Sequence, residues 1–71
     1  MMRGWIPAAG YEGYYWINEN LRIRNSKGKL LKPIVTSAGR FYCLRKWGQR
    51  ERVFARDLWV QSIAAKEEDE A

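Results

Sequence analysis

Basic and aromatic side chains alternate in two stretches of this chain, in a pattern that could hold a nucleic-acid backbone. Guanidinium and ammonium groups bind phosphates, and aromatic rings stack on bases. Period-two alternation in a first predicted hairpin, with Tyr15 and Ile17 pointing inward, would place four of these residues on one outer face: Tyr14, Trp16, Arg22 and Arg24. The following turn and a second predicted hairpin complete a candidate site for a nucleic acid or another partner, with Lys27, Lys29, Arg45, Lys46, Trp47, Arg50 and Arg52.

The sequence contains few residues that could catalyse a reaction. The chain has no histidine, so it lacks an imidazole base and a histidine metal ligand. Its single cysteine, Cys43, lies in a predicted strand with no histidine to activate it, and we interpret it as a small core residue. The acidic residues before the last segment have no recognisable spacing, and no glycine-rich phosphate loop is present. We therefore expect a protein that is not an enzyme and that carries no cofactor and no metal.

Length, composition and charge favour one small domain that attracts polyanions. The chain has 71 residues, of which 46% are apolar and 14% aromatic, and this is too rich in core-forming residues for a disordered protein. Residues 1–56 hold twelve basic and three acidic side chains, a net charge of +9, whereas residues 57–71 carry −4. We expect a domain over 1–66 and a flexible, solvated acidic tail over 67–71. A DNA-mimicking or self-screening role is the alternative for this tail.

The elements that must position the candidate site are short strands followed by a helix. Alternating and β-branched residues, separated by turns rich in Asn, Gly and Ser, predict antiparallel strands over 14–17, 21–24, 30–36, 40–46 and 50–55. Helical spacing then predicts a helix over 56–66 that lays Leu58, Trp59 and Ile63 across the sheet. The fold class is α+β: a small antiparallel sheet of four to five strands, in two hairpins, with one C-terminal helix.

Two features of the predicted strands stay open. Either Phe41 and Cys43 or Tyr42 and Leu44 could form the inward pair of strand 40–46, because both pairs suit a core. Tyr14 and Trp16 could contact a partner, or they could form a second small hydrophobic cluster closed by Trp5 or by the N-terminal arm.

A known family resembles this arrangement of residues. Trp5, the run Gly10-Tyr11-Glu12-Gly13-x-Tyr15-x-Ile17 and Ile23 are similar to the signature "W-x-x-I-x-G-Y-E-G-x-Y-x-V-S-N-x-G-x-V". That signature opens the type-four nuclease-associated modular DNA-binding domain of phage and intron HNH homing endonucleases. The stretch 29–33 is close to the family's "G-K-x-L-K-P", and 53–60 occupies the place of its "F-x-V-H-R-L-V-A". The resemblance covers roughly residues 5–63 and implies a small β-sheet module that lies on duplex DNA.

Three departures limit what the resemblance implies. The family's "S-N-x-G" turn is replaced by residues 18–21, which end in Leu21. Asp57 stands where a basic residue of "H-R-L" is usual. The nuclease core, with its catalytic and metal-binding residues, would follow the helix and is absent from these 71 residues. The resemblance therefore implies a DNA-positioning module, and no catalytic residue is carried over.

Two functions follow as hypotheses. The first is a non-catalytic DNA-binding protein of phage or mobile-element type; five phosphate contacts would give a slope of about −4 to −5 in log K against log salt. The second is a small phage-encoded inhibitor or adaptor that binds a host nuclease, polymerase or CRISPR effector, because Trp, Tyr and Arg are typical interface anchors. No apolar run approaches the ~20 residues of a membrane span and no signal peptide is recognisable, so we expect a cytoplasmic location, in an infected bacterial host under either hypothesis.

Overall fold

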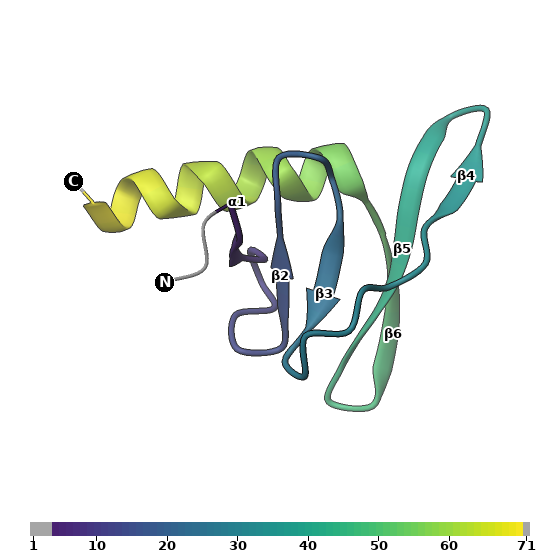
Figure 1. The fold of residues 1–71 in the computed structure, drawn as a ribbon, viewed down its shortest axis with the longest axis horizontal. Coiled ribbons are helices and arrows are strands. Elements are labelled where there is room, and N and C mark those ends of the chain that lie inside the picture. The colour runs from purple at the N-terminus through teal and green to yellow at the C-terminus, as the bar shows by residue number, and fades with distance from the viewer. Residues whose placement is uncertain (1–3, 71) are drawn as a thin grey trace.

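Two small antiparallel sheets and one helix make up the structure (Figure 1). The computed structural model describes residues 4–70. The first sheet has the order β1-β2-β3 and the second the order β4-β5-β6. In chain order the elements are β1 Ile6–Pro7, β2 Tyr15–Ile17, β3 Ile23–Asn25, β4 Ile34–Thr36, β5 Gly39–Lys46, β6 Gln49–Phe54 and α1 Ala55–Glu70. The predicted α+β class is confirmed, but the strands form two sheets instead of one, and the predicted strands did not include β1.

Asparagine side chains build the two turns that flank β3. The side-chain oxygen of Asn18 accepts the amide protons two and four residues further along the chain, at 3.0 Å each. Asn25 does the same at 2.9 and 3.0 Å. In each turn the fourth residue is left-handed: Leu21 has a φ of 61° and Gly28 a φ of 85°. Both turns lie where the sequence predicts them, and Asn suits them because its short amide mimics a backbone turn.

The second sheet is dominated by the long β5–β6 hairpin. Lys46 pairs with Gln49, so only Trp47 and Gly48 connect the two strands. Both connecting residues have positive φ, 55° and 78°, which defines a type I′ turn whose twist matches that of the strands. A two-residue turn fixes the register of all the pairs that follow it. The remaining strand, β4, is a short edge strand paired only with β5.

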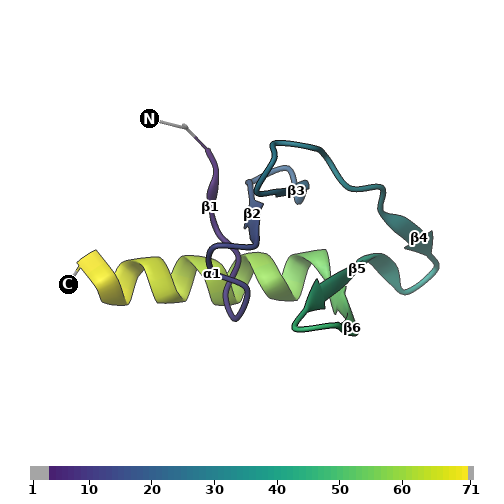
Figure 2. The same ribbon diagram turned by 90° about the horizontal axis from the view of Figure 1, so that it is seen from below.

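The helix packs across both sheets and closes one core between them (Figure 2). Ala55, Leu58 and Ser62 are all buried, and their spacing puts them on one face of α1. They pack with buried residues from both sheets and from the loop between β1 and β2: Ile6, Ala8, Tyr11, Ile17, Ile23, Tyr42 and Leu44. The helix runs to Glu70, four residues beyond its predicted end at Lys66. Residues 67–70 of the expected acidic tail are therefore helical in the structure, and residue 71 lies outside the described residues.

A serine in this apolar interface ties the N-terminal loop to the helix. Ser62 is 1% exposed, and its hydroxyl donates to the Leu58 carbonyl at 2.6 Å. The same oxygen accepts the Ala9 amide proton at 2.9 Å. Ser62 thus satisfies a backbone donor 53 positions away in sequence, which is why a polar side chain is tolerated at a core position.

Replacing this serine tests that account. Ser62→Ala leaves the Ala9 amide without its acceptor in the interface, and we expect the free energy of unfolding to fall by about 1–3 kcal/mol. Urea denaturation followed by circular dichroism measures the change. Ser37→Ala, at an exposed turn position, is the matched control and should change stability by no more than about 0.5 kcal/mol. Equal effects of the two substitutions would contradict the proposed role of Ser62.

Candidate nucleic-acid interface

The register of the β5–β6 hairpin decides which side chains face solvent. Tyr42 and Leu44 are 1% and 0% exposed, so they form the inward pair and the alternative pair of Phe41 and Cys43 points outward. The outward side chains of β5 lie opposite those of β6: Phe41 pairs with Phe54, Cys43 with Arg52 and Arg45 with Arg50. We call these six residues the outer face. On β6, Val53 is half-buried and points inward, whereas Arg50, Arg52 and Phe54 are exposed on the outward side.

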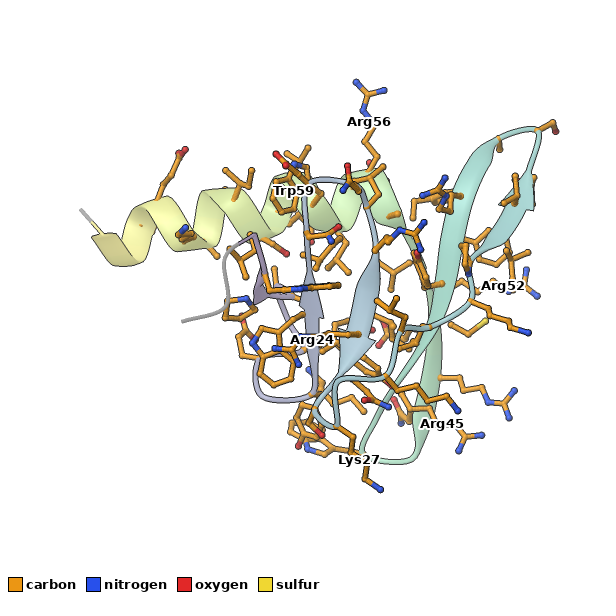
Figure 3. The ribbon with its side chains drawn as sticks, in the orientation of Figure 1. Arg24, Lys27, Arg45, Arg52, Arg56 and Trp59 are labelled. Carbon is orange, nitrogen blue, oxygen red and sulfur yellow. The ribbon has the colours of Figure 1, made fainter. Side chains whose placement is uncertain are left out.

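Positive charge is concentrated on one half of the outer face. Arg45 and Arg50 are direct cross-strand partners, and Arg52 follows on the same side of β6. Among the described residues, 4–70, none of the three guanidinium groups has a hydrogen bond or ion pair. The neighbouring carboxylate, Glu51, pairs with Leu44 on the inward side. In Figure 3 the side chains of Arg45 and Arg52 extend away from the helix and the first sheet.

The other half of the outer face is apolar. The Phe41 and Phe54 rings pack edge to face with centroids 5.8 Å apart. The Arg52 guanidinium carbon lies 5.5 Å from the Phe41 ring centroid, which joins the two halves. Ile34 of β4 pairs with Phe41 and is 44% exposed. The outer face therefore combines unneutralised cations with accessible aromatic rings, the two kinds of group that bind phosphates and bases.

Arg24, a predicted site residue, is buried inside the first sheet's own cluster. It is 7% exposed, and its guanidinium carbon lies 4.4 Å from the Trp16 ring centroid and 5.4 Å from that of Trp5. Its Nη1 donates to the Asn25 carbonyl at 3.0 Å. The expectation that Arg24 lies on an open face is wrong. Of the alternative cluster, Trp16 and Trp5 both contact Arg24, whereas Tyr14 is exposed and lies outside it. Cation–π contact with two rings holds Arg24 in place as a structural residue.

Lys46 has a comparable role where the two hairpins meet. Its ammonium donates to the Gly10 carbonyl and lies 5.2 Å from the Tyr11 ring centroid and 5.0 Å from that of Trp47. Burial raises the pKa of Tyr11, and the nearby Glu51 carboxylate raises it further. Lys46 points to the inward side of β5 and is only partly exposed. It therefore belongs to the junction and not to the outer face.

The remaining predicted residues lie in turns. Tyr14 and Trp47 come from different hairpins and are joined by a hydrogen bond of 3.1 Å from the Trp47 Nε1 to the Tyr14 hydroxyl. Lys27 and Lys29 are exposed in the turn that follows β3, and Arg22 is exposed in the turn that precedes it. In Figure 3 Lys27 lies at the same lower end of the molecule as Arg45. The eleven predicted residues thus divide between the outer face, the turns and structural clusters.

Sequence reasoning assigned Cys43 to the core and left Phe41 and Phe54 outside the site, whereas all three belong to the outer face. Cys43 is a free thiol exposed directly opposite Arg52. The signal that could have placed it is the two-residue turn, because pairing Lys46 with Gln49 puts Tyr42 opposite the inward Val53. Among the described side chains of residues 4–70, no three His, Cys, Asp or Glu form a group that could hold a metal ion. In the same range, no helix is long and apolar enough to cross a membrane.

Comparisons with known proteins give no match: neither a family model, nor a curated protein, nor a solved structure is similar enough to this chain to be assigned to it. The resemblance to the DNA-binding domain of homing endonucleases thus stays a prediction.

The position of Arg45 directly opposite Arg50 leads to a prediction about stability. Like charges directly across a strand pair are destabilising, and an opposite-charge pair at such a position contributes roughly 0.2–1 kcal/mol. Arg50→Glu replaces the like-charge pair Arg45–Arg50 with an opposite-charge pair. We therefore expect the free energy of unfolding to rise by about 0.5–1 kcal/mol, measured by urea denaturation at low salt.

Arg52→Glu is the control for this measurement. It makes the same change of charge on the same strand face, but Cys43 stands opposite it. Its effect should be smaller, and high salt should reduce the difference between the two variants because salt screens exposed charges. If Arg50→Glu is no more stable than Arg52→Glu, the two arginines do not repel each other appreciably.

Proposed function

We propose that this chain is a non-catalytic DNA-binding protein whose outer face contacts the phosphates of duplex DNA. The observation that carries the proposal is the placement of Arg45 opposite Arg50, with Arg52 beside them and no carboxylate on the same face. These cations repel each other in the free protein, and a polyanion that binds between them relieves the repulsion. The fold maintains this arrangement at a cost in stability, as binding sites commonly do.

The shape of the hairpin suits this ligand. A two-stranded β-ribbon fits the DNA major groove, which is about 12 Å wide. The eight residues of β5 and six of β6 form such a ribbon, with its arginine half next to the turn. The +9 charge of residues 1–56 adds a long-range field that attracts DNA from solution. The resemblance to a DNA-positioning module of phage homing endonucleases supports the same proposal.

A salt titration tests the proposal. Anisotropy of a labelled random-sequence duplex, measured at about 50, 100 and 200 mM salt, gives the slope of log K against log salt. Arg45→Ala with Arg50→Ala removes two phosphate contacts, so we expect the slope to become shallower by about 1.8 and the affinity at low salt to fall. The expected wild-type affinity is micromolar or tighter at the lowest salt, typical of sequence-independent binding.

The control has to separate local contacts from net charge. Lys32→Ala with Arg56→Ala removes the same charge from exposed positions that lie outside the outer face, and it should leave the slope nearly unchanged. Cys43, the only cysteine in the chain, supplies a second readout, because bound DNA should slow its alkylation by N-ethylmaleimide. Equal slopes for the two double variants, or alkylation at the same rate with and without DNA, would refute binding at the outer face.

A second candidate function rests on the apolar half of the outer face. Phe54 and Ile34, which pairs with Phe41, are each 44% exposed. An apolar patch bordered by arginines fits a protein partner that presents apolar side chains flanked by carboxylates. The candidate is an inhibitor or adaptor that binds a host nuclease, polymerase or CRISPR effector.

Substitutions on the two halves distinguish the candidates. Ile34→Lys with Phe54→Lys should abolish a stoichiometric complex with a purified host protein of these classes, because charged side chains cannot fill apolar contacts. The same variant should retain DNA binding, since it keeps all three arginines. If the Arg45→Ala and Arg50→Ala variant loses DNA binding while no purified candidate forms a complex with the wild type, the inhibitor function is rejected.

A further inference from the structure

Trp47 occupies a backbone conformation that disfavours its side chain. It is the first residue of the type I′ turn, with a φ of 55°, where Asn, Asp and Gly are the residues that fit without steric cost. Trp47 is also 81% exposed, the highest value among the exposed large hydrophobic residues of the described chain. Core burial therefore does not offset the strain. Strained residues of this kind concentrate at functional sites, where the function explains why they are kept.

The ring of Trp47 is held in one orientation although it is exposed. Its Nε1 donates to the Tyr14 hydroxyl at 3.1 Å, and the Lys46 ammonium lies 5.0 Å from its centroid. Lys46 is itself fixed by the Gly10 carbonyl and by the Tyr11 ring. Two direct contacts, from Tyr14 and from Lys46, thus order a large surface ring before any ligand arrives. A preorganised ring loses little conformational entropy when a flat ligand stacks on it.

The surroundings of this ring suit a nucleotide. The Lys46 ammonium, 5.0 Å from the ring centroid, carries positive charge close to where a phosphate would follow a stacked base. Tyr14, whose hydroxyl accepts the hydrogen bond from Trp47, is 43% exposed and widens the aromatic surface. Stacking on an aromatic ring is available to every base, because each base has a π-face.

We propose that Trp47 is a stacking platform for an unpaired nucleobase, so that the chain prefers DNA containing a single-stranded segment next to a duplex. This inference rests on the DNA-binding function proposed above and specifies its substrate. In an intact duplex each base is already stacked on its neighbours, and reaching the ring would require unstacking. A gap or a flanking single strand offers a base without that cost. The outer-face arginines hold the duplex, and Trp47, at the turn of the same ribbon, holds the unpaired base.

The test compares three ligands of the same sequence: a perfect duplex, a duplex with a short single-stranded gap, and the single strand alone. We expect the wild type to bind the gapped duplex about 10-fold more tightly than the perfect duplex, as one stacked base provides. Trp47→Asn should remove this preference while retaining the affinity for the perfect duplex. Asn fits the left-handed position, so this variant should fold at least as stably as the wild type.

Val35→Asn is the matched control, because it removes another exposed apolar side chain, 73% exposed, from a site away from the turn; it should keep the preference for the gapped duplex. Equal wild-type affinities for perfect and gapped duplexes would overturn the stacking inference and leave DNA binding intact. A preference that survives in Trp47→Asn would also overturn it. Failure to bind any of the three ligands would overturn both this inference and the DNA-binding function.

Discussion

The inward burial of Tyr42 is the constraint on which the rest of the structure depends. Its ring is 1% exposed in the shared core, and its hydroxyl donates to the Leu21 carbonyl, 3.0 Å away in the turn before β3. Burial raises the pKa of this hydroxyl, with a partly opposing effect from Arg40. One side chain thus joins the second sheet to the first. Because side chains alternate along a strand, fixing Tyr42 inward also sends Arg45 outward.

The same contact gives a reason for the left-handed conformation of Leu21. Its counterpart in the next turn is Gly28, which adopts positive φ without steric cost. Leu21 incurs that cost but packs its side chain against the core while its carbonyl accepts the Tyr42 hydroxyl. Trp47 has the same kind of backbone without comparable burial. The two residues therefore differ in their surroundings: Leu21 packs against the core, whereas Trp47 is held at the surface by the Tyr14 hydroxyl and the Lys46 ammonium.

Local patterns were enough to predict much of this fold. The asparagine turns, the hairpin closed near Gly48 and the start of the helix depend on neighbouring residues, and each lies within one or two positions of its prediction. The division into two sheets could not be predicted in this way, because it depends on which strands pair across the core. The helix extends beyond its predicted end because the preceding turns support residues 67–70, although their negative charges oppose the helix dipole.

The sequence was enough to predict which types of residue make up the candidate site, but not which of those residues share one surface. Arg24 and Arg45 are equivalent in sequence, since each is a basic residue in an alternating strand. Their environments differ because Arg24 meets the rings of Trp5 and Trp16, whereas Arg45 meets Arg50. A cation between two aromatic rings has its charge stabilised within the fold. A cation opposite another cation has no such stabilisation within the fold, so it can still attract an anionic ligand. The two enclosing rings therefore make Arg24 a structural residue, whereas the exposed pair Arg45 and Arg50 carries the proposed binding function.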